Sequence, residues 1–327
     1  MKKIILLVLY IAILHSNICS QNYKPYYSLI NKAENCIAES DFHKATCLYD
    51  SAFNMGLIPF GKDLHNAIVC NIFIDSLSKT VKYSENLFQL GIPLSYFNKD
   101  IFQKIRLSPY WTFIKKSFKK ITPITNINLR QELEKKFKLD QALDDPKREK
   151  YFYYNIKWLK DLILNNNFPF ENNVGASVGE VYITNIKIEL LLLHWSELDK
   201  EDTVRIVPHL IKLVKEGKLH PTSLAILHYN EISKLYSKMN NFAYLIIGEQ
   251  VLSPEFDLEE LSQINKSREE IGLNNFQDYQ KITKFSLSEK SFIFNTNRIL
   301  QLNKGLTDMF IRLGYKKLGT VKEIFKL

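Results

Sequence analysis

The sequence has 327 residues, of which 44 are basic and 35 acidic, so its formal net charge is 44 − 35 = +9. Hydrophobic residues make up 46% and charged residues 24%, a balance that is typical of globular proteins and excludes wholesale disorder. The 11 glycines and 10 prolines are too few for collagen-like segments, long flexible linkers or turn-rich β-sandwiches.

Residues 1–20 have the order of a secretory signal peptide. Lys2 and Lys3 precede an apolar run from Ile4 to Leu14, which is too short to span a bilayer, and polar residues come after it. We expect cleavage near Ser20 and export of the remaining chain to the periplasm or outside the cell. Lipoprotein anchoring at Cys19 is disfavoured because no small residue directly precedes it. No later segment is long and uncharged enough to be a transmembrane helix.

The basic charge of the predicted mature chain, 42 − 35 = +7, does not predict a nucleic-acid partner. Export argues against such a partner, and the basic residues are scattered among acidic ones. The densest basic cluster, residues 115–120, is interpreted as the solvated face of a helix.

Three cysteines remain in the predicted mature chain, at positions 36, 47 and 70. A disulfide between Cys36 and Cys47 is one alternative, since the compartment would be oxidising. The other interpretation, which we favour, is that the cysteines are small buried residues between packed helices.

Residues 21–121 are predicted to form tetratricopeptide-like helical repeats. Small and aromatic residues occupy the positions at which a tetratricopeptide hairpin packs its helices. A second, weaker unit lies 35 residues later. These positions are Ala33, Cys36, Phe42, Ala45, Tyr49 and Ala52, then Leu77, Thr80 and Leu87. Two repeats cannot bury a solenoid core alone, so we expect this unit to dock on the second half of the chain, through the aromatic residues of 96–113.

The remaining chain is predicted to be a helical domain over residues 126–284 and an extension over 285–327, after a boundary at 122–126. Helices are expected over 129–140, 151–164, 181–195, up to Glu216, from Pro221 onward to Leu235, and from Asp257 to Gly272. A short β-element near residues 290–295 and a final helix in the basic tail complete the prediction. The fold class is therefore mainly α.

Residues 128–275 resemble a bacterial family, domain of unknown function 6624. The resemblance rests on Asp140-Gln141, the region of Gly175 and Gly179, and the strings LLLH at 191–194, VPHL at 207–210, EGKLHP at 216–221 with Ala225, and INKSREEIGL at 264–273. The resemblance also implies upstream tetratricopeptide-like helices. It implies no activity.

Members of that family usually carry an Asp-Arg pair after the alanine helix and a Gln-x-Tyr-Gly string soon after it. Residues 225–230 and 242–245 lack both motifs, and Arg148 is displaced from the position expected after Asp140-Gln141. The resemblance therefore implies a degenerate member, which makes an enzyme less favoured than a binding protein.

The sequence offers one candidate metal site, around His194. His194 and Glu197 are three residues apart, so both could face one side of a helix, with His228 or Glu180 as a third ligand. A structural histidine at a helix end is the favoured alternative. The sequence contains no Gly-x-Ser-x-Gly elbow, no Walker loop and no Rossmann fingerprint, so no cofactor is predicted.

These patterns together predict an exported helical protein-interaction module that binds a peptide or another protein of the cell envelope. The alternative is a degenerate or metal-dependent envelope hydrolase centred on His194, with Glu197 as a second catalytic candidate.

Overall fold

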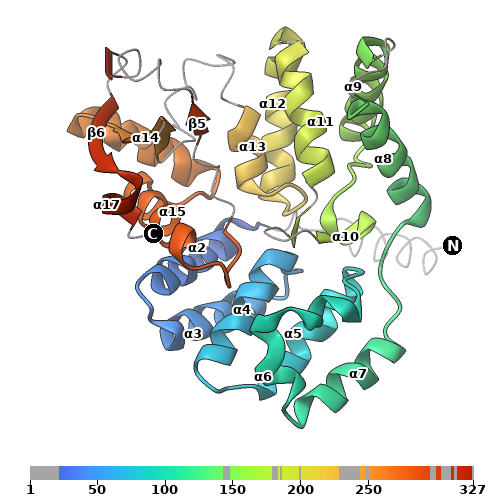
Figure 1. Ribbon diagram of the computed structural model, residues 1–327. Helices are drawn as coiled ribbons and strands as arrows, with labels where there is room; N and C mark the ends of the chain where they lie inside the picture. The colour runs from blue at the N-terminus through green and yellow to red at the C-terminus, as the bar shows by residue number, and fades with distance from the viewer. Residues whose placement is uncertain are drawn as a thin grey trace, which may run out of the picture.

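The computed structural model describes residues 22–142, 148–178, 183–184, 186–198, 200–227, 244–247, 250–294, 300–302, 311–312 and 315–325. The predicted signal segment and Cys19 lie outside these ranges. Within them the chain is mainly α-helical, as the sequence predicts (Figure 1). No helix among the described residues is long and apolar enough to cross a membrane.

The first half is built only of helices, which occupy the lower part of Figure 1. They are α2 (Lys24–Ala38), α3 (Phe42–Phe53), α4 (Gly61–Phe73), α5 (Ser78–Gln89), η1 (Leu94–Asn98), η2 (Asp100–Phe102), α6 (Gln103–Arg106) and α7 (Tyr110–Lys120). Helices α2 to α5 form two successive hairpins, which confirms the helical-hairpin architecture. Their assignment to tetratricopeptide repeats stays a prediction.

The predicted packing positions explain why these hairpins form. Ala33, Ala45 and Ala52 are fully buried, so the helices approach closely, and the Tyr49 ring fills the space between turns. Asp41 caps α3, its side chain accepting a hydrogen bond from the Lys44 amide at 3.0 Å. The contacts of Phe42 are not confined to α2 and α3. Its ring also packs on Phe73 of α4, with the ring centroids 4.6 Å apart.

Eight further elements form the middle of the chain, most of them in the upper part of Figure 1. They are α8 (Ile127–Asp140), α9 (Arg148–Leu164), α10 (Glu171–Val174), β1 (Ser177–Val178), β2 (Ile183–Thr184), α11 (Ile186–Leu198), α12 (Lys200–Lys215) and α13 (Pro221–Leu227). The predicted start of α11 at residue 181 is wrong, because residues 183–184 pair with β1 as a strand. The predicted continuation of α13 to Leu235 falls outside the described residues.

The last part of the chain contains a sheet that the sequence analysis missed. Its strands are ordered β5-β3-β4-β6; β3 pairs parallel with β5, and the other pairs are antiparallel. The elements are β3 (Leu245–Ile247), β4 (Gln250–Pro254), α14 (Leu258–Glu270), α15 (Phe276–Ser288), β5 (Leu300–Leu302), β6 (Tyr315–Thr320) and α17 (Val321–Phe325). The predicted capping box of Asp257 and Glu260 is confirmed at the start of α14.

Two expectations for the C-terminal extension are wrong. Residues 290–294 form no strand. The backbone N–H and C=O of Ile293 are both hydrogen-bonded to the side-chain amide of Asn66, so they are satisfied without a neighbouring strand. The tail is not one helix either, because residues 315–320 extend along β4 and only Val321–Phe325 is helical.

The aromatic segment 96–113 does not dock on the second half as expected. Phe97 contacts Phe88 and Phe102 within the first half, and Phe113 is exposed. The first half meets the rest of the chain through α2 and α4 instead. The hydroxyl of Tyr27 donates to the backbone carbonyl of Val214 at 2.8 Å. The backbone N–H of Tyr23 donates to the backbone carbonyl of Lys215 at 3.0 Å.

Residues 121–126, the predicted domain boundary, have no helical structure. The Ile124 amide donates to Gln89 in α5, and the Asn126 amide donates to Asn173 in α10. One hydrophobic core continues from α2 through α13 and on to Phe292, and a smaller one lies between the sheet and α14, α15 and α17. The division into domains stays a prediction.

Candidate functional site

His194, the residue singled out from the sequence, is paired with Asp140. His194 Nδ1 lies 2.7 Å from Asp140 Oδ2, and the ring of Phe152 lies 5.3 Å from the imidazole. Asp140 is the last residue of α8 and its side chain is 1% exposed, whereas that of His194 in α11 is 21% exposed. In many acid–base sites a buried carboxylate orients an accessible imidazole in this way. Pairs of a carboxylate and a histidine are also common in purely structural roles.

The rest of the predicted metal site is not brought together. The side chain of Glu197 and all of Glu180 and His228 lie outside what the structure describes. Among the residues it does describe, no group of three His, Cys, Asp or Glu side chains is placed to hold a metal ion. Asp140, the actual partner of His194, is indicated by the sequence only as part of the family resemblance.

The three cysteines of the first half are all free, so the structure contains no Cys36–Cys47 disulfide. Cys36 and Cys70 are buried, as the favoured interpretation predicts, but Cys47 is exposed on α3, so that prediction is wrong for Cys47. Burial raises the pKa of the Cys70 thiol well above its ordinary value, so this group is not a reactive thiolate.

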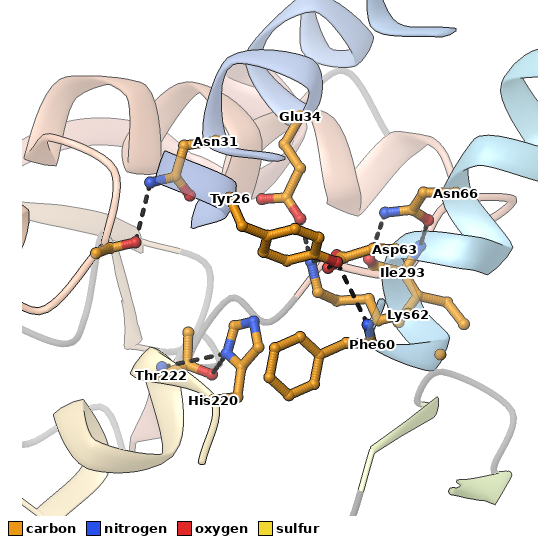
Figure 2. Close-up of polar contacts among 12 residues, drawn as sticks. Tyr26, Asn31, Glu34, Phe60, Lys62, Asp63, Asn66, His220, Thr222 and Ile293 are labelled. Atoms are coloured by element: carbon orange, nitrogen blue, oxygen red, sulfur yellow. Dashed lines mark hydrogen bonds and ion pairs between the residues drawn. The ribbon is translucent and has the colours of Figure 1, made fainter. Parts of the chain in front are cut away.

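The densest group of buried charges lies at the start of α4, where sequence analysis found nothing (Figure 2). Lys62 forms ion pairs with Glu34 of α2 and with the neighbouring Asp63, whose Oδ1 is 2.8 Å from Nζ. Asp63 also accepts a 2.6 Å hydrogen bond from the hydroxyl of Tyr26. The two carboxylates overcome the cost of burying the ammonium group and raise the pKa of Lys62, so it stays charged.

A third carboxylate, Glu171 of α10, lies at the same end of α4. Its Oε1 accepts a hydrogen bond from the backbone N–H of Gly61, the first residue of α4. Desolvation by burial raises the pKa of Glu171 to about 8, although the Gly61 hydrogen bond opposes the shift. The side chain is therefore mostly protonated at neutral pH. It links α10 to α4 without adding a full buried charge.

A small cleft opens beside Glu34 and Lys62, between α2, α13 and the segment that joins α14 to α15. Its free volume is about 40 Å³, room for a few water molecules or the tip of one side chain. His220 and Thr222 lie across the cleft from Lys62, and the ring of Phe60 packs edge-on against His220 at 5.2 Å (Figure 2). Burial lowers the pKa of His220 well below its ordinary value, so the imidazole is neutral.

Two larger hollows adjoin this cleft along the outer side of α2, with volumes of about 290 and 320 Å³. All three are lined by Gly272, and the cleft shares Tyr27 with one hollow and Asn31 with the other. We call the two hollows and the cleft together the α2 groove. Tyr27, Ile211 and Ile271 give it an apolar part, and Lys24, Lys32, Glu269 and Asp278 give it a charged rim.

Asparagine amides are concentrated in the α2 groove. The larger hollow is lined by Asn31, Asn35, Asn265, Asn274 and Asn275. Three of these amides are used within the protein: Asn31 donates to Gly272, Asn275 caps α15, and Asn265 bonds both Gln277 and the Phe276 amide. Of the other two, Asn35 has a side-chain oxygen that is buried without a hydrogen-bond partner in the described part of the chain, and Asn274 accepts a hydrogen bond from the Arg268 guanidinium through its backbone carbonyl.

Sequence reasoning missed both the charge cluster and the groove. The string Gly61-Lys62-Asp63 is typical of an exposed polar helix start, and distant contacts, including those with α2 and α10, bury it. The asparagines of the groove come in two groups, Asn31 with Asn35 and Asn265 with Asn274 and Asn275. The groups are more than 200 residues apart, so no local motif joins them. No family model, no curated protein and no solved structure matches the chain.

Proposed function

We propose that this protein is an interaction module that binds an extended peptide segment in the α2 groove. The observation that carries the proposal is a groove of three adjoining hollows with asparagine side chains on its wall. A peptide backbone carries one donor and one acceptor per residue, and an asparagine side chain offers both to it.

The shape of the α2 groove favours a peptide over a compact metabolite. Its volume is divided among three adjoining hollows, whereas a small-molecule site is usually one enclosed cavity. Asn35 and Asn274 line the larger hollow from opposite elements, α2 and the turn between α14 and α15. A segment lying between them would meet the Nδ2 donor of Asn35, whose Oδ1 is buried, and the side-chain amide of Asn274.

The narrow cleft would then receive one side chain of the peptide. Its walls carry Asn31, Thr222 and the rings of Tyr27 and Tyr279 beside the paired charges of Glu34 and Lys62. Because Lys62 is already paired with two carboxylates, a neutral polar side chain fits the cleft better than a charged one.

Selection of peptides from a displayed random library on the purified chain tests this proposal. Ser28 is exposed on α2 and lines the larger hollow, so Ser28→Trp should fill the groove and abolish binding of the selected peptides. Ser51→Trp is the matched control, because Ser51 is also an exposed serine within a helix but lies on α3. Peptides that bind both variants equally well would contradict the proposal.

We also propose that the chain is exported and that residues 128–275 form a domain of the family they resemble, domain of unknown function 6624. The contact between Asp140 and His194 supports the second point. These residues come from two separate motifs of the resemblance, 54 positions apart, and they lie 2.7 Å from each other. The amino-terminal sequence of the mature protein tests export and the cleavage near Ser20.

The same contact supports the second candidate function, a hydrolase centred on His194. An imidazole held by a buried carboxylate can act as a general base or as a metal ligand. Metal analysis of the purified chain beside His194→Ala tests it. Stoichiometric zinc or iron that is lost in the variant would favour the hydrolase over the peptide-binding module.

A further inference from the structure

Residues 101–131 form the most strongly basic segment of the chain. They contain seven basic side chains, those of Lys104, Arg106, Lys115, Lys116, Lys119, Lys120 and Arg130, and no acidic one. The four lysines of residues 115–120 all lie exposed on α7. None of them forms an ion pair with a described residue; Lys115 lies over the ring of Trp111 at 6.0 Å.

The same segment exposes large apolar side chains. Of the 14 large hydrophobic residues that are exposed in the described part of the chain, five lie within residues 107–127. They are Leu107, Phe113, Phe118, Ile124 and Ile127, with Leu107 80% exposed and Phe113 57% exposed. Exposed apolar groups that lie close together, instead of being scattered singly, favour an interaction surface. Of these five, Phe113 and Phe118 are on α7, and Leu107 comes three residues before it.

Helix α7 is held to the protein along one side. Ile114 is its only fully buried side chain, Phe118 packs on Phe88 of α5, and Ser117 donates a hydrogen bond to Glu85. At 100° per residue, Lys115, Lys116, Lys119 and Lys120 project from the other side, with Phe113 at its border. In Figure 1, α7 lies at the outer edge of the first-half helices, opposite α2.

We propose that this face of α7 docks on a bilayer containing anionic phospholipid. Lysines attract the headgroups electrostatically, and apolar side chains at their border enter the boundary between headgroups and acyl chains. Nucleic acid or another polyanion would use the lysines but would gain nothing from Leu107 and Phe113. Because α7 lies away from α2, the α2 groove stays open to its peptide when the protein is on a membrane.

Co-sedimentation with vesicles tests the proposal. The chain should bind vesicles of phosphatidylcholine and phosphatidylglycerol, should release them at high salt, and should not bind vesicles of phosphatidylcholine alone. The double variant Lys116→Glu, Lys120→Glu should weaken binding by about 30-fold or more. Lys266→Glu with Lys284→Glu is the control, since it changes the net charge equally at exposed sites on α14 and α15 and should bind as the wild type does.

A second pair of variants separates lipid from other anions. Phe113→Ser should weaken vesicle binding about tenfold, whereas Leu258→Ser, at an 88% exposed site on α14, should not change it. If the control variant Lys266→Glu, Lys284→Glu lost as much binding as the α7 variant, the proposal would be overturned. Equal binding to neutral and anionic vesicles would overturn it as well. Equally tight, salt-sensitive binding to duplex DNA with no effect of Phe113→Ser on either partner would also overturn it. Circular dichroism of each variant checks that the fold is intact.

Discussion

The side-chain amide of Asn31 donates a 3.0 Å hydrogen bond to the backbone carbonyl of Gly272, joining residues 241 positions apart. This contact fixes α2 against the turn after α14, and the α2 groove lies on both sides of it. Gly272 has φ +86°, and a Cβ there would lie 2.6 Å from Cδ2 of Tyr27. The two walls of the proposed binding site are therefore set by packing as well as by the hydrogen bond.

The close approach of Gly217 to Tyr23 predicts a large loss of stability for Gly217→Ala. Gly217 has φ +67°, and a Cβ at this position would lie 2.2 Å from Tyr23 Cζ, so the ring that anchors α2 must move. We expect the free energy of unfolding to fall by more than about 2 kcal/mol. Urea denaturation measures it.

Gly56→Ala is the control for that prediction. Gly56 has a similar φ of +74°, but nothing lies within 4 Å of the position its Cβ would take. This variant should lose only the conformational cost, about 1 kcal/mol. Equal losses in the two variants would mean that Tyr23 does not pack against Gly217.

The buried ammonium of Lys62 predicts that its removal is costly. Lys62→Met would leave the carboxylates of Glu34 and Asp63 buried without their cation, so we expect a loss of about 3–5 kcal/mol. Lys79→Met removes the exposed ion pair with Asp50 and should cost less than about 1 kcal/mol. Thermal and urea denaturation of both variants provide the comparison, and equal effects would contradict the buried cluster.

The raised pKa of Glu171 predicts that stability falls between about pH 6.5 and pH 8. In this window the folded state keeps a proton that the unfolded state, with an ordinary glutamate, has lost. The protein should lose about 2 kcal/mol as pH rises through this range. The buried histidines His65 and His220 oppose this loss only at the lower end of the window. Burial lowers the pKa of both, so they are neutral in the folded state, and the unfolded state loses their protons near pH 6.5.

Glu171→Gln should remove this pH dependence. The amide oxygen can still accept the hydrogen bond from Gly61, but the side chain has no proton to lose. Denaturation curves of the wild type and the variant at pH 6.5 and pH 8 measure the difference. A wild-type slope that persists in the variant would show that another group causes it.

The contact with Asp140 predicts a structural effect of His194→Ala. Without the imidazole, the buried Asp140 carboxylate loses its 2.7 Å partner and keeps the 2.8 Å hydrogen bond from the Gln141 side chain. We expect a loss of about 1–3 kcal/mol in stability. His194→Gln, which can restore a hydrogen bond to the carboxylate, should recover part of it, and no recovery would argue against this pairing.

Several elements could be predicted from the sequence because their signals are local. The capping box of Asp257 and Glu260 and the helix end before Gly217 each depend on residues within one turn of the helix end. The buried alanines of the first hairpin could be identified from spacing alone.

The sheet and the groove could not be predicted because their contacts are distant in the sequence. Strand β3 has only three residues, and its partners β4 and β5 lie on opposite sides of α14 and α15 in the chain. Ile293 is hydrogen-bonded by Asn66, a side chain in the middle of α4, so a strand pattern is present without a strand partner. The groove depends on α2 meeting the end of α14, which no local pattern encodes.

The most direct test of the central claim is the affinity of a library-selected peptide for the wild-type chain, for Ser28→Trp and for Ser51→Trp, measured by isothermal titration calorimetry. We predict that the peptide binds the wild type and Ser51→Trp with the same affinity and does not bind Ser28→Trp. Equal affinity for all three proteins would contradict peptide binding in the α2 groove.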